Sequence, residues 1–475
     1  MNRRIINTLF ICYVLFVVYN TLIPFSFDYG LSDLGELLRK VEWRPFVSDR
    51  GRLSLTDLAG NVILFIPFGF LCYMALQSAG ARHPIFLTLL GGAILSISIE
   101  FVQLFIKYRN TAPHDTINNV AGALIGALLA AIYSAKISNL ARRIFYELLD
   151  RKPFLLILVI VGLIQMVAAV MPFTVSITFS DLVKSIKNTN IIPLDYQSIG
   201  KLFFNSPNQH DALPFEIFAF FEDVLFWIAI GYLLMLCYRI YWRRKPYGRW
   251  LLIGLPLVYF PLREFAQLII ISRITDINDI ISGYLGIAAG IGFYYLLRPI
   301  RRKTFHQHLD LLAIPLGFYA IFILFAGFQP FDWSLSPEVI HSNLAAYNLV
   351  PFYSYFKKTS LWNMYDLINS LTFFLPISLY WTARLRLKNI PWYPIYFKTT
   401  LSGLGIGLLI ELTQLLSKVR VAEITDVLAY ALGGTLGTFL IYYWEHHIRQ
   451  MLGLYRQGIL LGKEAESGSA PELIS

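Results

Sequence analysis

Charged residues are scarce in this chain of 475 residues. Aspartate, glutamate, lysine and arginine make up 15% of it, whereas hydrophobic residues make up 56%. Because a soluble domain carries about 25% charged residues, this composition excludes an ordinary soluble protein. The apolar stretches 5–24, 86–106, 154–171 and 311–328 each approach the roughly 20 residues that a helix needs to cross a bilayer. The sequence therefore predicts a membrane protein with several spans.

Cysteine and histidine are also scarce. The three cysteines, Cys12, Cys72 and Cys237, lie in apolar stretches without CxxC spacing, so we expect small buried side chains rather than disulfides or metal ligands. The eight histidines lack metal-ligand spacing on a helix face. P-loop, GxSxG and HExxH motifs are not found. We therefore predict no cofactor and no metal site, and the sequence gives no positive reason to expect an enzyme.

The net charge of +10 comes from short basic segments between apolar spans. Such segments are typical of topology determinants rather than of a nucleic-acid surface, so we predict no nucleic-acid partner. The basic segments fall on one side of the predicted membrane, and the positive-inside rule makes that side cytoplasmic. We expect both termini there, with the proline-containing loops and the loops that carry Arg109, Arg273 and Arg420 facing outward.

One pattern of charged, amide and glycine residues occurs three times with the spacing E-x2-Q-x5-R-x5-D-x6-G-x3-G. Six fixed positions do not match three times by chance, so we infer an internal repeat. The sets are Glu100, Gln103, Arg109, Asp115, Gly122 and Gly126 in copy 1; Glu264, Gln267, Arg273, Asp279, Gly286 and Gly290 in copy 2; and Glu411, Gln414, Arg420, Asp426, Gly433 and Gly437 in copy 3.

Proline residues mark the same units. Pro24-Phe25, Pro172-Phe173 and Pro330-Phe331 each close the first apolar span of a copy, because proline cannot continue a helix. A long loop follows in each copy, and we expect it to fold back over the polar residues. Each of these loops contains a second proline, which is Pro45, Pro193 or Pro351.

The fold class is predicted to be all-α, a polytopic transmembrane bundle of about 12 helices. In each copy the third helix carries the glutamate and glutamine, and the fourth begins near the aspartate and holds the glycine pair. Four spans per copy is an even number, so the copies share one orientation as parallel repeats. The predicted segments are 1–150 for copy 1, 151–305 for copy 2, 306–450 for copy 3 and 451–475 for a polar, disordered cytoplasmic tail.

The repeated polar residues predict a cluster at the outer side of the membrane. Glutamate and glutamine three residues apart share a helix face, and an ionised carboxylate within a span is costly unless it is paired or hydrated. The arginine follows at the outer rim, and the aspartate favours the positive end of the next helix. We expect the four side chains to converge in each copy, and the glycine pairs to allow close helix packing.

Two interpretations fit such a cluster. It can bind a polar or anionic group, because the planar fork of arginine suits phosphate or carboxylate. It can instead staple the third helix to the fourth, with arginine bridging two carboxylates. Both interpretations stay open for copies 2 and 3. Copy 1 favours binding because it keeps the additional polar residues Asn61, His114, Asn118 and Asn119.

The segment Asn61–Gly69, NVILFIPFG, together with the polar set of copy 1 and Asn119, resembles the VanZ-like family of bacterial membrane proteins. The resemblance covers residues 5–135 well, and copies 2 and 3 resemble diverged members. Copies 2 and 3 depart from it where Asn61 corresponds to Asp223 and Ser370, and Asn119 to Gly283 and Tyr430. If these asparagines belong to an active site, only copy 1 retains it.

The resemblance implies a protein of the bacterial cytoplasmic membrane and a link to resistance against teicoplanin, a glycopeptide that binds cell-wall precursors. We expect the cluster to bind an anionic, lipid-linked or glycopeptide-related group at the outer leaflet, with membrane lipid and a cell-wall precursor as partners. Three alternatives stay open: a transporter or lipid flippase with a path between the copies, a membrane-embedded enzyme with Glu100 or Asp115 as base, and a structural membrane module.

Overall fold

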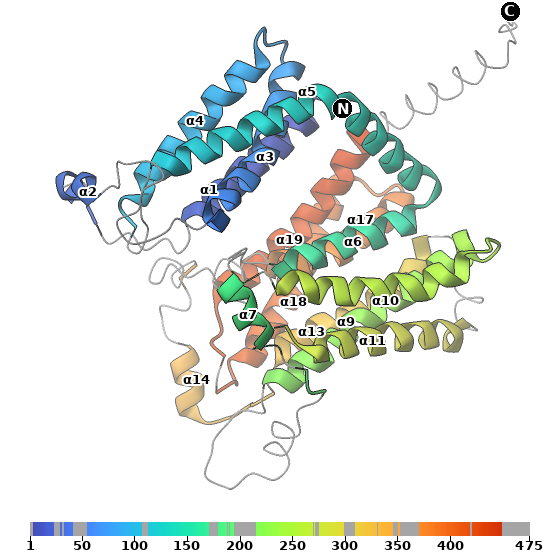
Figure 1. Cartoon of the computed structure of the whole chain (residues 1–475). Helices are drawn as coiled ribbons and strands as arrows, with labels where there is room; N and C mark the ends of the chain where they lie inside the picture. Colours follow the sequence, from blue (N-terminus) through green and yellow to red (C-terminus); the bar gives the residue numbers. More distant parts are fainter. Residues whose placement is uncertain are drawn as a thin grey trace, which may run out of the picture. The chain divides into compact units, whose positions relative to one another are not determined.

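A computed structural model gives the fold (Figure 1). It describes residues 3–22, 29–30, 33–40, 55–106, 113–170, 179–187, 189, 191–193, 215–268, 270, 275–298, 309–329, 331–344, 350–351, 370–418 and 420–448. Within these ranges the regular structure is helical, and an isolated antiparallel bridge joins Trp333 to Ser417. The all-α fold class is therefore confirmed.

The chain divides into two compact units. Unit 1 comprises Met1–Glu147, Val167–Thr189 and Phe265–Thr275, and unit 2 comprises Leu148–Met166, Asn190–Glu264 and Asp276–Ser475. The polar set of copy 1 falls within unit 1. Most of copies 2 and 3 falls within unit 2.

In unit 1, helix α3 packs against α1 and α4. A core of Val17, Phe65, Phe68, Cys72 and Ile99 fills the space between them. The fourth long helix, α5, reaches Arg151, so the predicted boundary at residue 150 falls at its end. The helices are α1 (Arg3–Leu22), α2 (Leu34–Lys40), α3 (Leu55–Ser78), α4 (Pro84–Gln103), α5 (Pro113–Arg151) and α7 (Phe179–Lys187).

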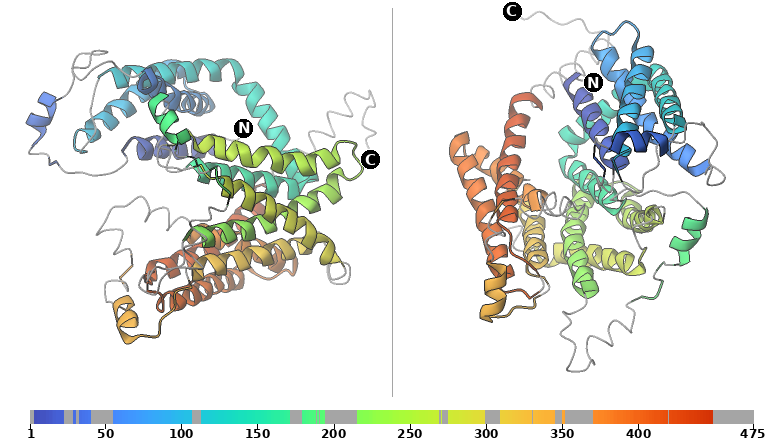
Figure 2. Two further views of the ribbon diagram at one scale, coloured as in Figure 1. Left: turned by 60° about the horizontal axis from the view of Figure 1, so that its bottom comes forward. Right: turned by 90° about the vertical axis from the view of Figure 1, so that its left-hand side faces the viewer.

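In unit 2, α9 packs against both α11 and α13, and α19 packs against α17 and α18 (Figure 2). A π-helical turn continues α9 at Tyr238–Trp242, and another continues α19 at Trp444–Ile448. The helices are α6 (Pro153–Val170, which ends in unit 1), α9 (Phe215–Cys237), α10 (Gly248–Gln267, which also ends in unit 1), α11 (Ile277–Leu296), α13 (Ala313–Phe328), α14 (Pro337–Asn343), α17 (Leu375–Leu387), α18 (Trp392–Gln414) and α19 (Ile424–Tyr443).

The helix ends fall at the repeated residues. The helices α1, α6 and α13 each end two residues before the proline of a Pro-Phe pair. The helices α4, α10 and α18 each end at the glutamine of the set, and α5, α11 and α19 each begin two residues before its aspartate. The same residues therefore end the third helix and begin the fourth in every copy, as the spacing predicted.

The glycine pairs lie at close helix contacts, as predicted. A Cβ atom on Gly122 or Gly126 of α5 would overlap backbone carbonyls of α3. A Cβ on Gly290 of α11 would likewise overlap the carbonyl of Ile228 in α9, and one on Gly433 of α19 would overlap the carbonyl of Leu371. Because backbone stands in the way, these contacts require glycine.

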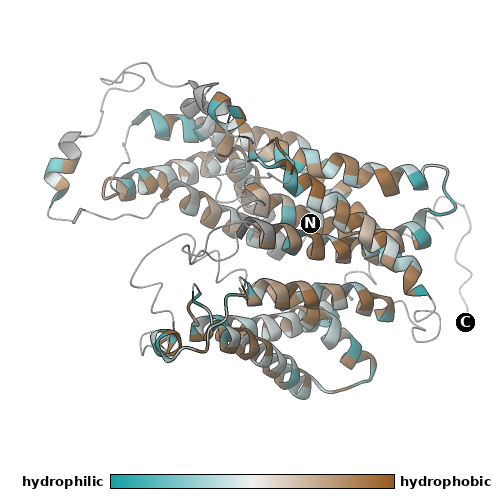
Figure 3. Cartoon of the chain, turned by 90° about the horizontal axis from the view of Figure 1, so that it is seen from below, coloured by the Kyte–Doolittle hydropathy of each residue, from teal (hydrophilic) through white to brown (hydrophobic). Residues whose placement is uncertain are grey.

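Hydrophobic residues predominate along the helices (Figure 3), and many of their large apolar side chains are exposed. On α4, for example, one exposed stripe consists of Phe86, Leu90, Ile94, Ile97 and Phe101. Such a face is stable in lipid and not in water. Among the described residues, nine helices are long and apolar enough to cross a membrane, so the chain is a multi-pass membrane protein.

Three further helices are less apolar or shorter. The apolar part of α1 is Ile6–Tyr19, α10 carries Arg263 and Glu264, and α17 has 13 residues. One expectation needs correction here. Cys72 and Cys237 are buried, but Cys12 lies on the exposed side of α1. It faces outward with its apolar neighbours Leu9, Ile11 and Leu15.

Candidate functional site: a repeated polar cluster and its aromatic plugs

The glutamate of each set is buried where the third helix ends. Glu100, Glu264 and Glu411 are 9%, 3% and 6% exposed. Oε2 of Glu264 accepts from the backbone N–H of Asp276 at 3.3 Å, and Oε2 of Glu411 accepts from that of Glu423 at 2.7 Å. Asp276 and Glu423 directly precede the fourth helix, so each carboxylate holds the loop between the third and fourth helices.

The glutamine of each set is also buried. The side-chain amide of Gln103 donates to the carbonyl of Thr21 at 2.7 Å, and that of Gln414 donates to the carbonyl of Gly327 at 3.2 Å. Both carbonyls belong to the last turn of the first helix, where no intrahelical donor is available. The glutamine therefore closes the end of α1 in copy 1 and of α13 in copy 3. Gln267 ends α10 in a buried position.

The aspartate of each set meets a residue of the second helix. In copy 1, Nδ2 of Asn61 donates to Oδ1 of Asp115 at 2.6 Å. In copy 3, the hydroxyl of Ser370 lies 3.4 Å from Oδ1 of Asp426. The equivalent residue in copy 2 is Asp223, so a second carboxylate stands where copies 1 and 3 have a neutral hydrogen-bond donor.

Arg263 balances this additional carboxylate in copy 2. Its Nη2 lies 3.2 Å from Oδ2 of Asp279 and 3.8 Å from Oδ2 of Asp223, and its Nε lies 3.2 Å from Oε1 of Glu264. Copies 1 and 3 have isoleucine at this position. Sequence reasoning missed Arg263, although a lone arginine in an apolar helix beside the repeated glutamate was a usable indication.

Of the three arginines in the repeated sets, Arg420 of copy 3 lies within the described residues. Arg109 and Arg273 lie outside the described residues. The guanidinium of Arg420 is exposed and donates to the carbonyl of Ala326 at 3.4 Å, and it lies near enough to Glu411 to act on that carboxylate electrostatically. Its described hydrogen bond is thus to the end of α13. The prediction that this arginine bridges two carboxylates stays a prediction.

The copies differ one helical turn below the glutamate. In copy 1, Nδ2 of Asn119 donates to the hydroxyl of Ser96 at 2.9 Å, and that hydroxyl lies 3.3 Å from the hydroxyl of Thr116. Each of these residues is polar, and together they join α4 to α5. Copy 1 therefore keeps a hydrogen-bonded polar layer within the bundle.

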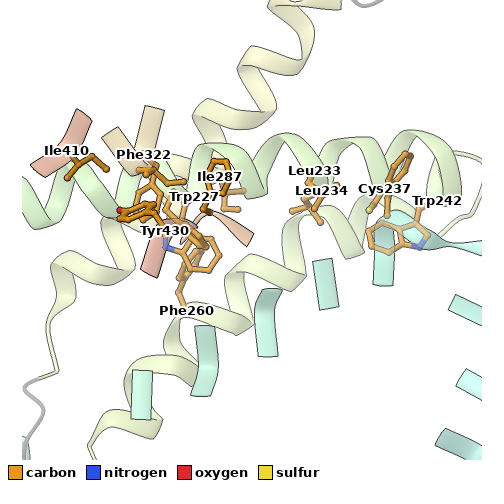
Figure 4. Close-up of a cluster of buried hydrophobic side chains, with 14 residues drawn as sticks. Trp227, Leu233, Leu234, Cys237, Trp242, Phe260, Ile287, Phe322, Ile410 and Tyr430 are labelled. Atoms are coloured by element: carbon orange, nitrogen blue, oxygen red, sulfur yellow. The ribbon is translucent and has the colours of Figure 1, made fainter. Parts of the chain in front are cut away.

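Copies 2 and 3 hold an aromatic ring in the same layer. In copy 2, the ring of Phe260 lies directly over Gly283, so that a Cβ there would overlap it. In copy 3 the glycine lies on the third helix and the aromatic residue on the fourth, so that Tyr430 of α19 packs beside Gly407 of α18. Both rings are buried in one apolar cluster of unit 2 (Figure 4). We call Phe260 and Tyr430 the aromatic plugs.

Copy 1 also retains two buried amide groups that have no hydrogen-bond partner among the described residues. These are Nδ2 of Asn118 and Oδ1 of Asn119, in side chains that are 9% and 4% exposed. Buried amides are normally paired, because an unpaired one loses its hydrogen bonds to water. His114, one helical turn before Asn118, is also buried, and its Nε2 lies 3.8 Å from Oδ1 of Asp115. All the additional polar residues predicted for copy 1 therefore lie near one end of its bundle interior.

A segment of the loop after α13 contacts the loop that follows α18 in copy 3. Asp332 accepts from the hydroxyl of Ser417 at 2.7 Å and from the backbone N–H of Lys418 at 3.0 Å. Nδ2 of Asn343, at the end of α14, donates to the carbonyl of Ser417 at 2.9 Å. Residues 331–344 therefore lie against the end of α18, whereas Pro351 lies beyond this segment and is exposed. The fold-back expected around the second prolines stays a prediction.

A family model described as VanZ/LLP1 matches the chain in three segments, residues 10–134, 154–298 and 312–445. The chain belongs to the VanZ/LLP1 family. Each matched segment contains one complete polar set, which confirms the resemblance to three tandem VanZ-like regions. No curated protein and no solved structure is significantly similar to the chain. Within this VanZ/LLP1 chain, only the first matched region has the polar layer in place of an aromatic plug.

Proposed function

We propose that this VanZ/LLP1 protein binds an anionic or lipid-linked group of the cell envelope at the outer leaflet, through the polar cluster of copy 1. A glycopeptide-related cell-wall precursor is the ligand class that the family resemblance favours. The binding residues are Asn61, Glu100, Gln103, Arg109, Asp115 and Asn119. Copies 2 and 3 support this site as structural modules, in which the same set of residues staples the helices.

The contrast between polar layer and aromatic plug supports this division of roles. In copies 2 and 3 the glutamates accept from loop amides, and Glu264 also pairs with Arg263. An aromatic ring fills the layer beneath. In copy 1 the equivalent layer is built from Ser96 and Asn119, and two buried amide groups remain available. A ligand-binding site needs such available groups, whereas a helix staple does not.

The topology proposed for this function has twelve spans in three parallel four-helix copies. The nine long apolar helices supply most of them. The helices α1, α10 and α17 complete the number, and α10 carries the exposed apolar side chains Trp250, Ile253 and Val258 as a lipid-facing helix would. The exposed Arg243, Arg244 and Lys245 between α9 and α10 support our proposal, by the positive-inside rule, that both termini lie in the cytoplasm of a bacterial cell.

The site can be tested in cells that depend on this protein for an envelope phenotype, such as susceptibility to a teicoplanin-type glycopeptide. We expect Arg109→Ala to abolish the phenotype, because it removes the cation of the copy 1 cluster. The equivalent Arg420→Ala in copy 3 is the control and should leave the phenotype in place. Membrane abundance is held equal for both variants. An unchanged phenotype in Arg109→Ala removes the site.

A further inference from the structure

Of the two buried amide groups of copy 1 described above, one is a hydrogen-bond acceptor and the other is a donor. The hydrogen bond to Ser96 uses Nδ2 of Asn119, which leaves its Oδ1 as a buried acceptor without a donor in the part of the chain that the structure describes. Nδ2 of Asn118 is a buried donor for which the described ranges offer no acceptor. The two residues are neighbours near the beginning of α5. Copy 1 thus offers one acceptor and one donor on adjacent residues.

The glycines around these residues locate the leftover groups inside the bundle. Gly122, one turn after Asn118, contacts α3 at Val62, and Ala123, one turn after Asn119, contacts Gly69 of α3 and Gly92 of α4. Residues one turn apart share a helix face. Asn118 and Asn119 therefore belong to the face of α5 that packs on α3 and α4, beneath Glu100 and Asp115, and not to the lipid-facing side.

A ligand that satisfies both groups must donate one hydrogen bond and accept another. A single hydroxyl can do both only through one oxygen atom, whereas a ligand with separate donor and acceptor atoms can reach two groups on adjacent residues without that constraint. A phosphate ester cannot do this, because its ionised oxygens only accept. A secondary amide can, because its N–H and C=O are distinct groups on one rigid plane. Copies 2 and 3 offer no such pair, since the equivalents of Asn118 and Asn119 are Ser282 and Gly283 in copy 2 and Ala429 and Tyr430 in copy 3.

We propose that copy 1 selects a ligand that carries a secondary amide, as in an acetamido sugar or a short peptide linked to lipid. Asn118 donates to the amide carbonyl, and Asn119 accepts from the amide N–H. The proposal rests on the proposed function and adds to it the chemical class of the ligand.

Two alkyl sugars that differ in one group provide the test. The full chain is purified in dodecyl maltoside, and binding of decyl N-acetyl-β-glucosaminide is compared with that of decyl β-glucoside, which has a hydroxyl in place of the acetamido group. N-lauroyl-dialanine is the peptide probe. We expect a preference of about tenfold for one amide probe over the glucoside, because a buried polar partner left unpaired is costly. The probe that shows the preference distinguishes a sugar from a peptide source.

Two variants connect that preference to the asparagines. Asn119→Ala should abolish it, and Asn118→Ala, which keeps the bond between Asn119 and Ser96, should reduce it. Tyr430→Phe in copy 3 is the control and should preserve it. Equal binding of the amide and hydroxyl probes, a preference that survives both asparagine substitutions, or binding of neither amide probe overturns the proposal. The proposed function is decided separately, by the phenotype of Arg109→Ala in cells.

Discussion

Asn119 on α5 donates its side-chain amide to the hydroxyl of Ser96 on α4 at 2.9 Å, in the layer where the other two copies hold an aromatic ring. The ring comes from α10 in copy 2, as Phe260, and from α19 in copy 3, as Tyr430. Each ring faces a glycine on the opposite helix. The same space is thus filled from opposite sides in two copies and kept polar in the third.

The first prediction concerns a variant that places the aromatic residue of copy 3 at the equivalent position of copy 1. Ser96→Gly combined with Asn119→Tyr gives copy 1 the pair found in copy 3, and we expect the protein to fold with unchanged or higher thermal stability, because an aromatic ring replaces an incompletely bonded amide. The envelope phenotype should be lost. Thermal unfolding in detergent and the phenotype at equal membrane abundance measure the two effects. The converse change, Gly407→Ser with Tyr430→Asn, is the control and should not remove the phenotype, and loss of the phenotype in that control alone would contradict the account.

The second prediction concerns Arg263. Arg263→Leu leaves Asp223 and Asp279 facing each other without their shared cation, so it should lower the free energy of unfolding by about 3–5 kcal/mol. Adding Asp223→Asn should recover most of the lost free energy of unfolding, because asparagine pairs with the equivalent aspartate in copy 1. Unfolding of the purified protein in denaturing detergent compares the two variants. A double variant no more stable than Arg263→Leu alone would show that Asp223 and Arg263 are not coupled.

The third prediction uses two glycines of α11. Gly290 lies against the backbone of α9, whereas a Cβ atom added to Gly292 would meet no atom of a neighbouring described element within 4 Å. Gly290→Ala should therefore lower stability by about 1–3 kcal/mol through overpacking. Gly292→Ala should be neutral or slightly stabilising, since alanine is the better helix former. Equal effects of the two substitutions on thermal unfolding would argue against the close contact.

The fourth prediction concerns the loop segment 331–344 in copy 3. Asn343 donates to backbone carbonyls at the end of α18 and in the loop after it, including that of Ser417. Asn343→Ala should leave these carbonyls unpaired and speed hydrogen exchange in residues 415–418. His341→Ala, an exposed change in the same short helix, is the control. Exchange that stays equal in both variants would mean that the segment does not hold this loop.

The helix ends could be predicted from the sequence because the residues that end helices are local. Proline two residues beyond a span and aspartate near a helix start act on their own turn, so the ends of α13 and the start of α19 follow from their motifs. The glycine contacts were predictable for the same reason. Burial of Glu264 and Glu411 followed from the cost of a charge in lipid.

The plugs and the ion pairs of copy 2 could not be predicted in this way. Asn119 could be matched with Tyr430 along the sequence, but the accompanying change from Ser96 to Gly407 has meaning only when the two helices are known to face each other. Arg263 likewise gains its meaning from Asp223, which is far away in the sequence and on another helix. The contacts of Asn343 depend on the path of a long loop, which no local pattern specifies.

The central claim is that copy 1 binds the ligand while copies 2 and 3 are structural, and three equivalent substitutions test it most directly. Glutamine keeps one acceptor oxygen, so the loop amides that bond to Glu264 and Glu411 keep a partner in Glu264→Gln and Glu411→Gln. We expect these two proteins and Glu100→Gln to fold. With membrane abundance held equal, the account predicts that Glu100→Gln alone loses the envelope phenotype. Equal loss in all three variants, or loss in Glu264→Gln or Glu411→Gln with Glu100→Gln unaffected, would contradict it.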